Sequence, residues 1–255
     1  MGKIRLVDVT PDNVQDEGVY CLQNPRAPGF QRKLEWFNKR HQEGLRLKVL
    51  RDQDDKQVGF IESVPAEYAW RPVHAPRYLF IQCILIARKQ NVGLGYGSML
   101  VKAVESDARE SGKAGVATMT SSGVWMVGQP LFLKRGYKEV DAKERFVLLA
   151  KSFAPGDPAP VFLDWEKQRK KYAGWHLVYA DQCPWHEKAA VALAETAAAF
   201  GVDLNIKKLT TARQAQAAPS GYGVFNLLHD GRLLEDHYVS ATRFKSILKN
   251  ELVQA

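Results

Sequence analysis

The run Tyr78-Leu-Phe-Ile-Gln-Cys-Ile-Leu-Ile-Ala87 is followed by Arg88-Lys89 and then by Gln90-Asn-Val-Gly-Leu-Gly-Tyr-Gly97. The first part is almost continuously apolar, which predicts a buried strand. The last part gathers glycines directly before a helical pattern. Glycine adopts backbone angles that other residues avoid, so main-chain N–H groups here can approach a pyrophosphate, and the following helix adds its positive end. Residues 90–97 therefore predict a phosphate-binding turn.

The segment 96–110 has the pattern of an amphipathic helix, with apolar side chains at Leu100, Ala103, Val104 and Ala108 on one side. A helix of this kind packs against a sheet and is expected to end near Gly112. Two other interpretations of the glycines are a flexible turn and a dinucleotide fingerprint. The fingerprint needs G-x-G-x-x-G after an early strand, whereas here the spacing is G-x-G-x-G in mid-domain, which disfavours a dinucleotide site.

Further apolar runs predict strands at 45–50, 58–64, 114–120 and 145–151, and helical patterns lie at 30–43 and 96–110. Between Phe153 and Val161 the sequence Phe-Ala-Pro-Gly-Asp-Pro-Ala-Pro-Val suits an extended connector. With 255 residues the chain is long enough for two cores. We expect an α/β domain at 1–153, a linker with a leading helix at 154–173, and a second α/β domain at 174–255.

Two motifs resemble those of the Gcn5-related N-acetyltransferases. Gln90-x-x-Gly93-x-Gly95 is similar to the family's Arg/Gln-x-x-Gly-x-Gly/Ala signature, and the segment 131–140 resembles its later Phe-Tyr-Glu-Lys-Leu-Gly-Phe segment. The likeness covers roughly residues 3–152. It implies a mixed, mostly antiparallel sheet with flanking helices, and acetyl-CoA as the acyl donor. In such a protein the pantetheine arm would pair with backbone at Leu85 and Ile86, and the pyrophosphate would rest on Gln90, Asn91, Val92, Gly93, Leu94, Gly95, Tyr96 and Gly97.

Acyl transfer also needs a proton acceptor for the attacking amine. Glu62 and Glu67 are the candidates, although each could equally be a surface carboxylate paired with an arginine. The family's usual acid, a tyrosine, aligns with Phe132, which has no proton to donate. The leaving thiolate could depart unassisted or with help from Tyr96 or from the serines at 121 and 122.

The segment 64–77 gathers aromatic and basic side chains that suit an aromatic or carboxylate-bearing amine, and the acceptor residues we predict from it are Tyr68, Trp70 and Arg71. A structured loop with surface arginines is the alternative. The formal charge of +8 would suit polyanionic partners, but the basic run 167–171 is short and favours a solvated helix face over nucleic-acid contact. No metal-ligand spacing, membrane span or secretion signal is evident, and a cytoplasmic location is the default expectation.

The second half predicts strand 175–180, helix 187–200, strand 202–209, a short helix, strands 223–228 and 232–238, and helix 240–252. This βαβ-ββα order resembles the thioredoxin fold, and Cys183-Pro184-Trp185-His186 is similar to the glutaredoxin motif with its second cysteine replaced. A Gcn5-related domain followed by such a module also resembles the YoaP-type acetyltransferases. Cys183 is expected to be more reactive than Cys83, which the strand pattern buries, and we count it as a possible substrate contact.

Taken together, the sequence predicts an enzyme that transfers an acetyl group from acetyl-CoA to the amine of a small molecule. One alternative is a non-catalytic protein that binds acyl-CoA or recruits a partner, since the family's usual acid and a central-strand glutamate are missing. Another is a thiol-dependent redox or binding protein centred on Cys183, although His186 leaves it without an internal resolving thiol.

Overall fold

The computed structural model describes residues 4–19, 21–22, 24–154 and 156–253. The described chain packs as two compact units. The first unit lies within residues 1–23, 37–69 and 73–162, and the second within 24–36, 70–72 and 163–255. A single cut near residue 153 does not reproduce this division, because two short segments of the first half are built into the second unit. Sequence patterns could not indicate that exchange, since it depends on which apolar side chains meet in three dimensions.

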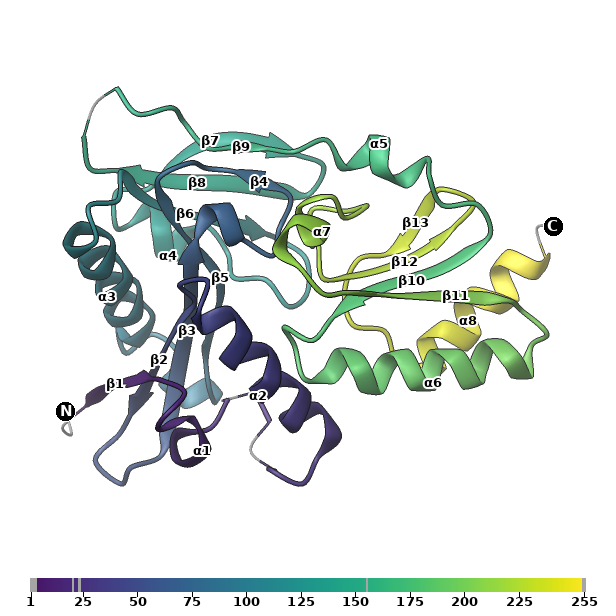
Figure 1. Ribbon diagram of the computed structural model, residues 1–255, viewed down its shortest axis with the longest axis horizontal. Coiled ribbons are helices and arrows are strands. Elements are labelled where there is room, and N and C mark those ends of the chain that lie inside the picture. Colours follow the sequence, from purple (N-terminus) through teal and green to yellow (C-terminus); the bar gives the residue numbers. More distant parts are fainter. Residues whose placement is uncertain (1–3, 20, 23, 155, 254–255) are drawn as a thin grey trace. The chain divides into compact units, whose positions relative to one another are not determined.

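A seven-stranded sheet in the order β1-β2-β3-β5-β6-β8-β7 forms the centre of the first unit (Figure 1). Only β5 and β6 run parallel among the described pairs of this sheet. The mixed, mostly antiparallel sheet predicted above is thereby confirmed. Its strands are β1 (Arg5–Val9), β2 (Arg46–Arg51), β3 (Gln57–Pro65), β5 (Tyr78–Ile86), β6 (Gly115–Ser121), β7 (Lys138–Lys143) and β8 (Phe146–Ser152).

Short elements complete the first unit. A small two-stranded sheet pairs β4 (Val73–His74) with β9 (Val161–Phe162). The remaining helices are α1 (Val14–Glu17), η1 (Ala66–Tyr68), η2 (Lys89–Asn91), α3 (Tyr96–Glu110) and α4 (Pro130–Leu133). Helix α2 (Pro28–His41) begins in the second unit and ends in the first. The predicted strands and the helices at 30–43 and 96–110 are confirmed, with ends shifted by at most two residues.

The core of the first unit lies between the sheet and helix α3. Leu100, Val104 and Ala108 are fully buried there against apolar side chains of β3, β5, β6 and β8. This confirms the apolar face predicted for the helix. Burying a leucine or valine side chain such as Leu100 or Val104 stabilises the fold by about 1.5–3 kcal/mol.

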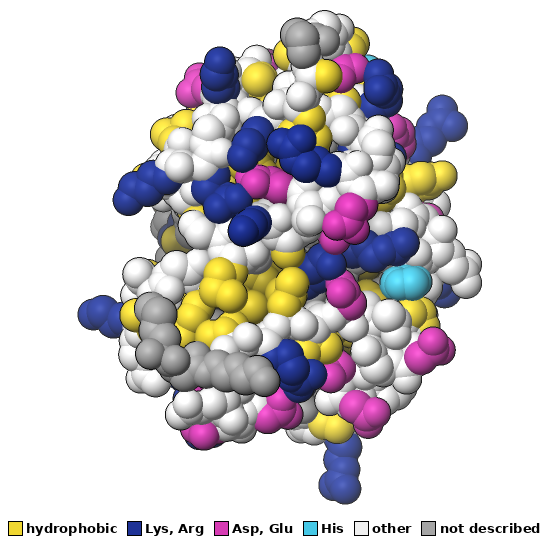
Figure 2. Space-filling view, turned by 90° about the vertical axis from the view of Figure 1, so that its left-hand side faces the viewer, with side chains coloured by type: hydrophobic (Ala, Val, Ile, Leu, Met, Phe, Trp, Pro, Cys, Tyr) yellow, Lys and Arg dark blue, Asp and Glu magenta, His cyan; other side chains and the backbone are white. Residues whose placement is uncertain are grey.

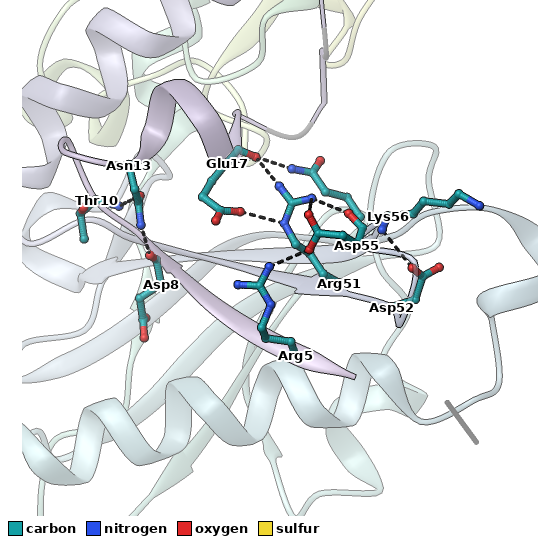
Figure 3. Close-up of polar contacts among 10 residues, drawn as sticks. Arg5, Asp8, Thr10, Asn13, Glu17, Arg51, Asp52, Asp55 and Lys56 are labelled. Atoms are coloured by element: carbon teal, nitrogen blue, oxygen red, sulfur yellow. Dashed lines mark hydrogen bonds and ion pairs between the residues drawn. The ribbon is translucent and has the colours of Figure 1, made fainter. Parts of the chain in front are cut away.

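Ion pairs connect the outer strands to the rest of the unit. The buried ammonium of Lys48 on β2 pairs with Asp8 on β1 and, at 3.1 Å, with Asp107 on α3. At the far end of the same strand, Arg51 Nε donates to Glu17 Oε2 at 2.8 Å and Arg51 Nη1 to the carbonyl of Asp55 at 2.6 Å (Figure 3). These contacts tie α1 and the β2–β3 turn together.

Charges of both signs are mixed on the surface. Figure 2 shows Lys and Arg side chains gathered on one part of the face that it presents, with Asp and Glu side chains among them, beside a patch of hydrophobic side chains. Since carboxylates interrupt the basic side chains, this face does not form an uninterrupted positive stripe of the kind that tracks a nucleic-acid backbone.

The second unit is built on a four-stranded sheet in the order β11-β10-β12-β13 (Figure 1). Strands β10 and β11 are parallel, and β10–β12 and β12–β13 are antiparallel. The predicted order of strands and helices is confirmed. The elements are α5 (Trp165–Arg169), β10 (Trp175–Ala180), α6 (Trp185–Ala199), β11 (Leu204–Leu209), α7 (Ala212–Gln216), β12 (Phe225–His229), β13 (Arg232–Glu235) and α8 (Ala241–Val253).

Candidate functional site

The sheet opens between its two parallel strands. Among the described residues, β5 pairs with β6 only from Tyr78–Gly115 to Ile81–Thr118. Each strand nevertheless continues with its other neighbour, β5 as far as Ile86 and β6 as far as Ser121. The two strands therefore separate beyond Ile81, and residues 84–86 lie past the last described pair of β5 with β6. Backbone N–H and C=O groups at such a place can bind a linear ligand that carries amides.

A bulge lies where the strands separate. The register of β3 against β5 shifts between Glu62 and Ser63, so Gln82 is an extra residue in β5. A bulge bends its strand and increases the local twist, which turns the end of β5 away from β6. The amide Nε2 of Gln82 donates to Glu62 Oε2 at 3.4 Å, and both side chains are buried. A carboxylate is thus held directly beside the opening.

The glycine turn follows the separated end of β5. Gly93 and Gly95 have φ values of +89° and +84°, and an added Cβ at either would meet no described atom within 4 Å. The backbone conformation therefore requires glycine at both positions, and the space beside them is open to a ligand. Gly97 differs from the expectation above: it lies within α3 with no positive φ, and its Cβ would come to 3.2 Å from Leu131 Cδ1. Its small size serves packing.

The predicted cofactor residues lie together, at the end of β5, in η2 and at the start of α3. Leu85, Gln90, Val92 and Leu94 are exposed, and the others among them that carry side chains are half-buried. Asn91 has a local role, because its Nδ2 donates to the carbonyl of Ala87 at 2.8 Å and closes the turn. Helix α3 begins at Tyr96 with no side-chain cap on Gly95, which leaves first-turn N–H groups for an anion.

The two candidate bases occupy different surroundings. Glu67 is exposed, and its Oε1 accepts a hydrogen bond from the backbone N–H of Arg77 at 2.9 Å. That contact gives it a structural role in closing the loop between β3 and β5. Glu62 lies on β3 next to the bulge and is the carboxylate that faces Gln82. The structure therefore favours Glu62 over Glu67 by position.

The candidate acids also have different surroundings in the structure. Tyr96 is half-buried at the first position of α3. Ser121 is buried, and its Oγ accepts hydrogen bonds from Arg145 Nη1 at 2.7 Å and from the backbone of Gly123 at 3.1 Å. Phe132 is fully buried and packs edge-to-face on Tyr137 with ring centroids 5.3 Å apart. Sequence reasoning missed Arg145, since an arginine in a β7–β8 turn gives no signal of a partner 24 positions earlier.

The predicted acceptor residues differ in their exposure and in the unit to which they belong. Tyr68 is 45% exposed and belongs to the first unit, whereas Trp70 and Arg71 are 1% and 5% exposed and belong to the second. Cys183 is half-buried in the second unit, in the turn before α6. Cys83 is half-buried as well, which corrects the expectation that the strand pattern buries it, because it lies in the part of β5 that β6 does not cover.

His186 of the Cys-Pro-Trp-His motif is a buried structural residue. It is fully buried, its Nδ1 lies 3.0 Å from the carbonyl of Ala180, and its ring packs against Phe225 at 5.1 Å. Burial lowers the pKa of His186 to about 3, and the positive charges of Arg71 and Lys33 act in the same direction. This histidine is therefore neutral at pH 7.

The mostly antiparallel sheet and the glycine turn before α3 agree with what the resemblance found in the sequence implies. Over 248 residues the chain is 24% identical to the uncharacterised N-acetyltransferase YoaP of Bacillus subtilis (strain 168), a match that covers 95% of this chain and 97% of YoaP. No family model matches the chain.

Two of the solved structures that are similar to part of the chain are acetyltransferases in complex with a coenzyme A ligand. One is the PaiA N-acetyltransferase of Thermoplasma acidophilum in complex with coenzyme A, with 12% identity, a TM-score of 0.43, and coverage of 59% of this chain and 99% of that one. The other is a GNAT family acetyltransferase from Brucella melitensis in complex with acetyl-CoA, with 15% identity, a TM-score of 0.39, and coverage of 62% and 93%. Among the described helices, none is long and apolar enough to cross a membrane.

Proposed function

We propose that this protein transfers the acetyl group of acetyl-CoA to the amine of a small molecule. The observation that carries the proposal is the opening between β5 and β6, which leads directly onto the glycine turn before α3. A pantetheine arm carries amides that can pair with the exposed backbone of a strand, and a pyrophosphate suits a helix start. The full-length similarity to a protein named as an N-acetyltransferase supports the same activity.

In this proposal the backbone at Leu85 and Ile86 holds the pantetheine arm, and residues 90–97 hold the pyrophosphate. The end of β5 that has separated from β6 offers N–H groups to polarise the thioester carbonyl, which develops negative charge when it is attacked. The attacking amine nitrogen forms an amide bond to the acetyl carbon, the carbon–sulfur bond breaks, and coenzyme A leaves as the thiolate. Without a strong acid, such a site accelerates the transfer mainly by holding both reactants in the right orientation.

The amine loses a proton during the transfer, and we assign its acceptance to Glu62. This carboxylate lies beside the bulge at Gln82, next to the opening, whereas Glu67 is committed to the backbone of Arg77. Tyr96, at the start of α3, is the hydroxyl that we place nearest the leaving sulfur. Tyr68 is the acceptor contact that we retain from the sequence, because its ring is exposed while Trp70 and Arg71 are buried.

For the second unit we propose a thioredoxin-like fold. Its sheet order β11-β10-β12-β13 with one parallel and two antiparallel pairs, followed by α8, is the βαβ-ββα order expected of that fold. Thiol–disulfide exchange is not part of the proposal, since His186 stands in the position of a resolving cysteine and is buried as a neutral ring.

The test of the cofactor site is a matched pair of glycine variants. Gly93→Asp places a carboxylate where the pyrophosphate is assigned, whereas Gly136→Asp makes the same change at another open position of the first unit with φ +83°. Calorimetry with acetyl-CoA should show binding weakened at least about a hundredfold in Gly93→Asp, from lost phosphate contacts plus charge repulsion. Equal affinities in the two folded variants would contradict the assigned site.

The acceptor class is tested separately with the wild-type protein. Release of free thiol from acetyl-CoA should be accelerated by some members of a panel of small amines, and mass spectrometry should find an acetylated amine as the product. Binding of acetyl-CoA without acceleration by any amine of the panel would favour the non-catalytic alternative.

A further inference from the structure

Polar side chains lie on both sides of the opening, on the face of the seven-stranded sheet that is turned away from α3. Successive side chains of a strand point to opposite faces. Ile61 on β3 and Val116 on β6 are packed in the core under α3. Glu62 follows Ile61, Ser121 lies an odd number of positions after Val116, and the register of these stretches against β2 and β8 is regular. Glu62 and Ser121 therefore point to the same face, opposite to α3.

Arg145 brings a guanidinium to this end of β6. Its Nη1 donates to Ser121 Oγ at 2.7 Å, and its Cζ lies 4.3 Å from the ring centroid of Phe146, which pairs with Ser121 across β8 and β6. Because β5 and β6 run parallel, their ends lie at the same edge of the sheet, and that is where the two strands have separated. The cation therefore lies on the β6 side of the opening, and all of these residues belong to the first unit.

The loop that follows β6 fits closely around this cation. The backbone N–H of Gly123 donates to the same Ser121 Oγ at 3.1 Å. An added Cβ at Gly123 would overlap Arg145 Nη1 and lie 2.9 Å from Arg145 Cζ. Gly123 is not among the described glycines of positive φ, so backbone conformation alone would allow a side chain there. The position of the guanidinium therefore depends on a residue without a side chain at 123.

Charges of opposite sign thus lie on either side of the opening. Strand β5 stands between β3, which carries Glu62, and β6, and a strand spacing of about 4.8 Å separates the two charges by at least on the order of 10 Å. A small molecule with an amine and a carboxylate complements this arrangement, with the amine toward Glu62 and the carboxylate toward Arg145. A guanidinium presents its N–H groups in a planar fork that matches a carboxylate, whereas a diamine would bring a second cation toward it.

From this arrangement we propose that Arg145 determines which acceptors the protein uses, by pairing with a carboxylate that the acceptor carries in addition to its amine. The inference rests on the proposed acetyl transfer, because it names the substrate class of the same site. Ser121 and Phe146 hold the guanidinium in place, so Ser121 is a positioning residue and not an acid. The site then favours amino acids and other amino-carboxylic acids over neutral amines and over diamines.

The experiment compares amino-carboxylic acids, from α-amino acids to γ-aminobutyrate, with their own carboxamides in the thiol-release assay. The carboxylate preference is the ratio of kcat/KM for an acid to that for its carboxamide. For the best acid of the panel it should be at least about tenfold in the wild type and fall to within about twofold of one in Arg145→Met, by loss of charged hydrogen bonds. Lys138→Met, at the exposed far end of β7, should keep the wild-type preference. The same two compounds are used with every protein, so the difference between the pKa values of their amines cancels.

A second pair of variants keeps Arg145 itself and tests the inference even if Arg145→Met fails to fold. Gly123→Ala displaces the guanidinium, which can move because it is the end of a flexible side chain. Gly128→Ala adds the same methyl group to the same loop, where its nearest neighbour would be Pro130 Cδ at 3.5 Å, an ordinary contact. The carboxylate preference should fall at least about threefold in Gly123→Ala and stay within about twofold of the wild-type value in Gly128→Ala. A preference that neither Arg145→Met nor Gly123→Ala lowers would overturn the inference, as would faster turnover of diamines than of the acids.

Binding of the carboxylate is also measured without turnover, with coenzyme A in place of acetyl-CoA. The NMR signal of the Arg145 Nε–H group, assigned by its loss in Arg145→Met, should shift when acids of the panel are added and stay in place with their carboxamides. This shift in a protein that transfers no acetyl group to any amine would refute the proposed activity and support the carboxylate site. Measurable transfer to the acids without the shift would overturn the carboxylate site alone.

Discussion

Protonation of His186 should destabilise the folded protein at mildly acidic pH. The ring is fully buried, and burial first, then the charges of Arg71 and Lys33, lowers the pKa of His186 from 6.5 to about 3 in the folded chain. In the unfolded chain the imidazole regains its ordinary pKa of about 6.5. Between these two values the unfolded state binds a proton that the folded state does not, so stability falls as pH decreases.

The size of the effect follows from the two pKa values of His186. A difference of about 3.5 between them corresponds to about 5 kcal/mol, which is the limit reached below pH 3. At pH 5 only the interval from 6.5 down to 5 contributes, and the loss is about 2 kcal/mol. Above pH 7 the folded and unfolded states both carry a neutral ring, and the contribution vanishes. The loss of about 2 kcal/mol at pH 5 is a measurable part of the 5–15 kcal/mol by which a folded chain is typically stabilised.

The assay is urea unfolding at pH 7.5 and pH 5.0, at constant ionic strength, for the wild type and for His186→Phe. The phenyl ring has a similar shape and no titrating nitrogen. The free energy of unfolding at pH 5.0 is compared with that at pH 7.5 for each protein separately, so any pH-independent cost of the substitution cancels. The wild type should lose about 2 kcal/mol more than the variant between the two pH values. Equal losses would refute the reasoning, as would a titration of the His186 ring near pH 6.5 observed by NMR in the folded protein.

Three further predictions concern the first unit. Glu62→Gln should lower kcat about a hundredfold in the amine-dependent thiol-release assay if this carboxylate accepts the proton, whereas Glu67→Gln should change kcat less than about threefold. Lys48→Met should lower the free energy of unfolding by about 1–2 kcal/mol, because it leaves the carboxylate of Asp107 without its buried partner, and thermal unfolding of the variant measures this. Gly97→Val should weaken acetyl-CoA binding less than Gly93→Asp does in calorimetry, because residue 97 contacts a neighbouring helix and not the open turn.

Local sequence determined the elements of this protein more closely than their assembly. The apolar run from Tyr78 and the glycines after it predicted strand β5, the turn and helix α3, with the helix bounds of 96–110 as observed. These features depend on side-chain periodicity and on backbone angles that only glycine adopts readily, and both are properties of neighbouring residues. For the same reason the strand and helix order of the second half could be predicted from its patterns.

Tertiary structure decided what these elements do with one another. That Gln82 is a bulge, that β6 leaves β5 after Ile81, and that Glu62 lies beside the bulge depend on the register between strands distant in sequence. Arg71 is the clearest case. Its neighbours in sequence suggest an exposed acceptor site, yet its guanidinium is buried beside Gln182, 111 positions away. No local pattern encodes such a contact, because burial and pairing are set by which surfaces meet when the whole chain packs.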